Sequence, residues 1–175
     1  MSRALTLFDD RVAVWAAVGV AAALLSFRPL ARRFSCGPAV LLLAMLSAEF
    51  VVLVTIANRG FDVSSDGLQE QLLWWTDGAD VPRGSDALGW GFNAALFVPV
   101  AFFVTLLSRR PWFVVGVLVA VSMLVETAQA MFLTGRPDQF DLLANSAGAV
   151  IGAALGQLVM ASRPRPASVG TNSTP

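Results

Sequence analysis

The sequence contains no histidine and no lysine, and it has a single cysteine, Cys36. Without histidine the chain cannot build a Ser-His-Asp triad, a Cys-His pair or a histidine-ligated zinc site. Without lysine it has neither the lysine of a phosphate-binding loop nor one that forms a Schiff base. One cysteine cannot form an internal disulfide. Any catalytic base would have to be an aspartate or a glutamate.

Charge is also scarce. Only 14% of the 175 residues are charged, whereas about 25% is usual in soluble domains. The mean hydropathy is +0.68. The twelve basic residues, all arginine, balance twelve acidic ones, so the net charge is zero and nothing indicates a nucleic acid as a partner. The composition is that of a membrane protein.

Five apolar runs stand out, over residues 12–27, 39–57, 88–107, 112–133 and 141–161. A run of about 17 to 25 residues spans the hydrocarbon core of a bilayer. The first run is short, but Arg11 and Arg28 at its ends can extend toward the headgroups. A cleaved signal peptide is the competing interpretation, and it fits poorly because Asp9 and Asp10 precede the run. We therefore predict an all-α bundle of about five transmembrane helices, forming one domain over residues 1–161.

Prolines are expected to mark the ends of these helices, at Pro29, Pro38, Pro111 and Pro137. The connections there are short, so neighbouring helices should run antiparallel. The one long connection, residues 58–87, has Leu68, Leu72 and Trp75 at helical spacing. It is predicted to form a helix on the bilayer surface, with a loop packed on its own helices as the alternative.

Arginine counts indicate the orientation of the chain. With the N-terminus outside, seven arginines flank the inner membrane face and five the outer one. The inner set is Arg28, Arg32, Arg33, Arg109, Arg110, Arg163 and Arg165; the outer set is Arg3, Arg11, Arg59, Arg83 and Arg136. The C-terminal tail, residues 162–175, is rich in proline, serine and threonine and is predicted to be disordered in the cytoplasm.

Polar residues are concentrated in the last three predicted helices. Ser122, Glu126 and Gln129 share one face of the fourth helix, at 100° per residue. On the fifth helix Asp141 and Asn145 fall on the same stripe as Gly148, Gly152 and Gly156. This stripe should face protein, because small residues at a spacing of four allow a neighbouring helix to approach closely.

All of these polar positions approach one membrane surface, which the arginine counts make the outer one. We predict a polar, ligand-binding pocket that opens outward among the third, fourth and fifth helices. Arg136 would be its only cation. The candidate binding residues are Asn93, Glu126, Gln129, Arg136, Asp138, Asp141 and Asn145, and no metal site is assigned.

The sequence here resembles the VanZ-like family of small bacterial membrane proteins. The resemblance rests on "NAALFVPVAFF", "ETAQ" and "GRPDQFDLLANSAGAVIGAALG", and it covers about residues 89–156. The matching positions are Asn93, Pro99, Glu126, Gln129, Arg136, Asp141, Asn145, Gly148 and Gly152. The resemblance implies a multi-pass protein of the bacterial cell membrane with a role in the cell envelope, and resistance to glycopeptide antibiotics of the teicoplanin type.

Several functions fit this pattern. We favour a non-enzymatic protein that binds a lipid-linked cell-wall precursor, a lipid, an antibiotic or a partner protein. The alternative is an enzyme that modifies an envelope lipid or peptidoglycan precursor, with Glu126 or Asp141 as base and a divalent metal. A channel or transporter has less support, although a homo-oligomer such as a dimer could enclose a path. In the simplest interpretation Glu126, Gln129 and Asn145 only join helices by hydrogen bonds.

Overall fold

The structure is a computed structural model that describes residues 10–57, 87–132 and 139–162. These residues form long helices with short connections. The elements are α1 (Asp10–Arg33), α2 (Pro38–Val52), η1 (Leu53–Ala57), α4 (Ala87–Ser108), α5 (Pro111–Phe132) and α6 (Gln139–Ala161). By length and composition, five helices of the described part can cross a membrane, with η1 continuing α2. The predicted all-α transmembrane bundle is confirmed, while the predicted surface helix and the tail beyond Ser162 lie outside the described residues.

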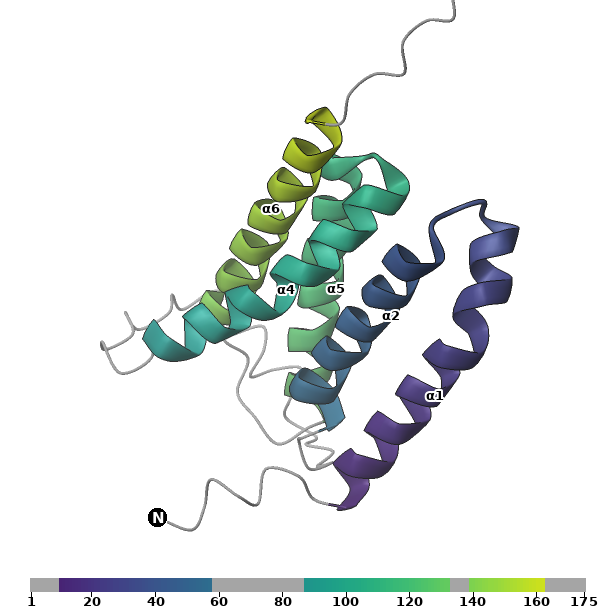
Figure 1. Cartoon of the computed structure of the whole chain (residues 1–175). Coiled ribbons are helices and arrows are strands. Elements are labelled where there is room, and N and C mark those ends of the chain that lie inside the picture. Colours follow the sequence, from purple (N-terminus) through teal and green to yellow (C-terminus); the bar gives the residue numbers. More distant parts are fainter. Residues whose placement is uncertain (1–9, 58–86, 133–138, 163–175) are drawn as a thin grey trace, which may run out of the picture.

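The helix α4 is the centre of the bundle (Figure 1). It lies between α6 and α2 and also contacts α5, whereas α1 is outermost and packs on α2 and η1. The buried core is accordingly built around α4, which contributes Leu96, Phe97, Val100 and Ala101. Val51 of α2, Val114 and Leu118 of α5 and Ala149 of α6 complete it.

The closest helix pair is α4 with α6, and glycine makes this approach possible. Gly148, Gly152 and Gly156 of α6 are buried. A Cβ atom at Gly148 would collide with the backbone carbonyl of Ala94, and one at Gly152 with that of Val98. The predicted small-residue stripe of α6 therefore faces protein, and the helix it faces is α4.

The first two helices differ from the sequence prediction. Pro29 lies inside α1, which continues to Arg33, so Pro29 does not mark a boundary. The ring removes one hydrogen bond from the helix, at its exposed end, where the chain tolerates the loss. The predicted span 39–57 is an α-helix only to Val52, followed by a five-residue π-helix. The other predicted ends agree with the structure to within two residues.

The outer surface of the bundle is apolar. Large hydrophobic side chains are exposed on every spanning helix, among them Leu25, Phe50, Leu88, Phe113 and Leu158. In water such a surface would aggregate. A lipid bilayer accommodates it, because lipid tails are as apolar as these side chains. The protein is therefore a multi-pass membrane protein.

The two ends of the bundle differ in charge. Five of the six arginines in the described ranges lie where α1, α4 and α6 end and α2 and α5 begin, which is one end of the molecule in Figure 1. They are Arg28, Arg32, Arg33, Arg109 and Arg110. We call this the arginine-rich end. Arg11, at the start of α1, lies at the opposite end.

Candidate functional site

The polar side chains of α4, α5 and α6 lie in the half of the bundle farther from the arginine-rich end. We call this set, Asn93, Ser122, Glu126, Gln129, Asp141 and Asn145, the polar cluster. Asn93 of α4 donates from Nδ2 to Oδ1 of Asp141 on α6 at 2.5 Å. Both side chains are half-buried. A hydrogen bond to a carboxylate is stronger than one between neutral groups, so this contact fixes the start of α6 beside α4.

A second hydrogen bond joins α5 to α6. Asn145 donates from Nδ2 to the hydroxyl of Ser122 at 2.9 Å, and both residues are buried. Because the two helices are antiparallel, Glu126 and Asp141 each lie one turn from this contact toward the same end. Four residues of an α-helix rise about 6 Å along its axis. The two carboxyl groups therefore lie at similar depth, with the amide of Asn93 beside one of them.

A third hydrogen bond joins α5 to the end of η1. Gln129 donates from Nε2 to the backbone carbonyl of Thr55 at 3.0 Å. The last carbonyls of a helix have no donor within the helix, and the Gln129 amide supplies one. The polar cluster is thus attached to four elements, one more than the three helices of the prediction.

Glu126 and Gln129 are buried, unlike polar side chains at the surface of the protein. Glu126 is 3% exposed and Gln129 2% exposed. Among the described residues the Oε1 atom of Gln129 has no hydrogen-bond donor, although it is buried. A buried acceptor left without a donor costs about 1 to 3 kcal/mol. Turning the amide over would place Oε1 against the Thr55 carbonyl, which is worse, so the observed orientation is the favourable one.

Five of the seven predicted site residues are described. Asn93 pairs with Asp141, Asn145 with Ser122 and Gln129 with the Thr55 carbonyl, and Glu126 is buried one turn beyond Ser122 on α5. Arg136 and Asp138 lie outside the described residues. Sequence reasoning missed the Thr55 carbonyl, because no sequence pattern marks which backbone group a distant amide will meet. Within the described ranges, no group of three or more His, Cys, Asp or Glu residues could hold a metal ion.

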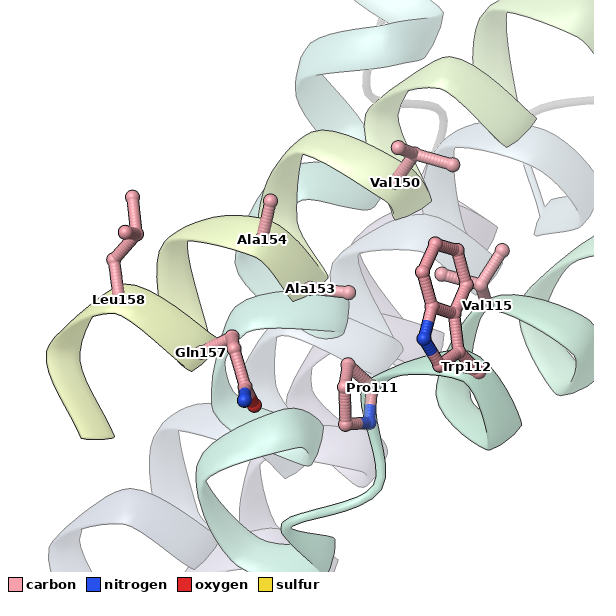
Figure 2. A pocket seen from close by; sticks show the side chains of 8 residues that line it. All are labelled: Pro111, Trp112, Val115, Val150, Ala153, Ala154, Gln157 and Leu158. Atoms are coloured by element: carbon pink, nitrogen blue, oxygen red, sulfur yellow. The ribbon is translucent and has the colours of Figure 1, made fainter. Parts of the chain in front are cut away.

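A groove between α5 and α6 lies elsewhere, near the arginine-rich end (Figure 2). Its volume is about 380 Å³. Figure 2 shows Trp112 and Val115 of α5 and Val150, Ala153 and Gln157 of α6 around it. Its walls are apolar apart from the Gln157 amide and the indole nitrogen of Trp112, and no residue of the polar cluster lines it. The groove is a feature of the lipid-facing surface and is separate from the candidate site.

Fold and site together define a multi-pass helical membrane protein with a buried polar cluster held by hydrogen bonds between helices. Comparison with family models gives a match to VanZ/LLP1 over residues 46–160, well over half of the chain. The chain belongs to this VanZ/LLP1 family. The match includes Thr55 and the whole polar cluster, and it leaves α1 outside. No curated protein and no solved structure matched the chain.

Proposed function

We propose that the polar cluster binds the polar part of a cell-envelope molecule at the outer face of a bacterial membrane. The molecule would be a lipid-linked cell-wall precursor, a lipid or a glycopeptide antibiotic of the teicoplanin type. The protein would act by binding, and the family resemblance implies a role in resistance to such antibiotics. This proposal places the cluster at the outer face because the arginine-rich end should face the cytoplasm.

The observation that carries the proposal is the buried, unpartnered acceptor of Gln129 one turn from the buried carboxyl group of Glu126. A cluster that served only to join helices would gain stability by satisfying every buried polar atom. Ionisable residues within the membrane are costly and are retained at substrate and ligand sites. Gln129 Oε1 can accept from an N–H or O–H group of a ligand.

The chemistry of the polar cluster indicates what it can bind. Its described members offer two carboxyl groups, two carboxamides besides Gln129 and one hydroxyl, all suited to hydroxyl, amide and amine groups. Sugar and peptide portions of wall precursors and of glycopeptides carry such groups in number. Arg136, which stands in the sequence between α5 and α6, would add a partner for a carboxylate or phosphate.

The test compares Glu126→Gln with Glu49→Gln. Both changes remove one carboxylate from a spanning helix and keep the shape of the side chain. Glu49 is half-buried on α2, with its carboxyl group against Gly19 of α1, outside the polar cluster. Binding of a labelled lipid-linked precursor and of a teicoplanin-type antibiotic is measured on purified protein in nanodiscs, and susceptibility is measured in cells.

Glu126→Gln should weaken binding of one ligand by about ten-fold or more, the value of a hydrogen bond to a charged group. Susceptibility should change in parallel, and Glu49→Gln should have little effect on either measurement. Unchanged binding and susceptibility in a folded Glu126→Gln protein would remove the basis of the proposal. Covalent change in extracted lipids that depends on Glu126 would instead support the metal-dependent enzyme.

A further inference from the structure

A second opening lies between α1 and α2 at the arginine-rich end. We call it the α1–α2 cavity, and its volume is about 540 Å³. Arg28 and Arg32 line it together with Phe27, Cys36, Ala39 and Leu42. It therefore combines two positive charges with apolar walls. It is remote from the polar cluster and lies outside the part of the chain that matches the VanZ/LLP1 family.

The two charges are not balanced within the described part of the protein. Arg28 and Arg32 are four residues apart on α1, so they share one face of the helix. The Cζ atom of Arg28 lies 5.6 Å from the centroid of the Phe27 ring, a cation–π contact. The nearest acidic residue of α2, Glu49, is eleven residues beyond Pro38, about 16 Å along the helix.

Backbone groups around the cavity also favour an anion. The helix α2 begins here with Pro38 in its first turn, and its N-cap, Gly37, has no side chain that could accept from the first amide groups. The amide groups of Ala39 and Val40 have no acceptor within the helix, and a helix N-terminus attracts negative charge.

The carbonyl end of α1, which would repel an anion, is closed by the chain itself. Cys36 N–H donates to the Ala31 carbonyl at 3.0 Å, and Ser35 N–H donates to the Arg32 carbonyl at 3.3 Å. These two bonds and the positive φ of 50° at Ser35 form a Schellman motif. The carbonyls of Ala31 and Arg32 are therefore already engaged and do not face a ligand as free acceptors.

We propose that the α1–α2 cavity binds the headgroup of an anionic phospholipid, with the phosphate between Arg28 and Arg32. Basic pockets between transmembrane helices bind such headgroups. An acyl chain would cover Ala39 and Leu42, whereas inorganic phosphate would leave these apolar walls in water. A zwitterionic lipid is disfavoured because its ammonium group would approach an arginine. The site does not depend on the function proposed for the polar cluster.

Cys36, the only cysteine, reports on occupancy because it lines the cavity. The full chain is placed in nanodiscs of phosphatidylcholine alone or of phosphatidylcholine with phosphatidylglycerol, and the rate of Cys36 labelling by a maleimide is measured. The ratio of the two rates is compared for the wild type, the Arg28→Gln/Arg32→Gln variant and the Arg109→Gln/Arg110→Gln variant. The last variant removes the same charge from the same end, at two exposed residues that do not line the cavity.

Phosphatidylglycerol should slow labelling of the wild type and of Arg109→Gln/Arg110→Gln. Arg28→Gln/Arg32→Gln should need about 30-fold more phosphatidylglycerol for the same protection of Cys36. Each arginine near an anionic lipid contributes about 1 kcal/mol, and the loss of both weakens binding by this factor. Inorganic phosphate added to phosphatidylcholine nanodiscs should not protect Cys36. Equal loss of Cys36 protection in both double variants would indicate an effect of diffuse surface charge. Protection by inorganic phosphate alone would indicate a simple anion site. Unaltered protection in Arg28→Gln/Arg32→Gln would exclude these arginines from lipid binding. Each of these three results overturns the proposal.

Discussion

The packing of α4 against α6 makes a strong prediction for Gly152→Ala. A Cβ atom at position 152 would lie 2.8 Å from the Cβ of Ala101 and closer still to the Val98 carbonyl oxygen. Ordinary contacts of this kind begin at 3.4 Å. The neighbours are a backbone carbonyl and a methyl group on a rigid helix, so no flexible side chain can turn away.

The Val98 carbonyl oxygen is the closer neighbour, so the two helices must separate by about 1 Å to restore ordinary packing distances. Overpacking of this kind costs about 1 to 3 kcal/mol. The separation also strains the hydrogen bond from Asn93 to Asp141, which joins the same two helices. We expect Gly152→Ala to lower the free energy of unfolding by about 2 kcal/mol.

Gly116→Ala is the matched control. Gly116 is on α5, and a Cβ atom there would meet nothing within 4 Å. Since alanine favours helix more than glycine does, this change should be neutral or stabilising by up to about 1 kcal/mol. Unfolding of both variants is followed by helical circular dichroism in the same detergent. If Gly152→Ala proved as stable as Gly116→Ala, the close approach of α4 and α6 would be wrong.

Two further predictions concern single side chains, and a third tests the orientation indicated by the arginine counts. Thr105→Val should stabilise the protein by about 1 kcal/mol, because the Thr105 hydroxyl is buried without a partner among the described residues; a loss of stability in thermal unfolding would contradict this. Ser122→Ala and Asn145→Ala, combined in a double-mutant cycle, should show a coupling of about 0.6 to 1.7 kcal/mol, and strictly additive effects would mean that their hydrogen bond contributes nothing. An impermeant maleimide should label Cys36 in inverted vesicles and not in intact cells, and the reverse should hold for Gly91→Cys in a Cys36→Ser background; the opposite pattern would invert the orientation.

The sequence was sufficient to predict where the last three helices begin and end. Their apolar runs are bounded by Pro111 or by the polar residues around Gln139, which leaves little choice of ends. It was less informative for the first helix. The apolar run stops at Phe27, and Pro29 suggested a boundary, yet α1 continues for another turn and a half to Arg33. A proline near an exposed helix end removes only one hydrogen bond, so the sequence rule overestimated its effect.

Helical periodicity by itself determined that Glu126 and Gln129 share a face of α5 and that Asp141 and Asn145 share the glycine stripe of α6, since 100° per residue is a property of every α-helix. Which side chains meet was decided only by the tertiary structure. The pairing of Asn145 with Ser122 and of Asn93 with Asp141 depends on the relative heights of three helices, and the bond from Gln129 to the Thr55 carbonyl depends on a π-helical end. These relations follow from how closely the helices approach one another, and periodicity within one helix carries no information about its height beside a neighbour.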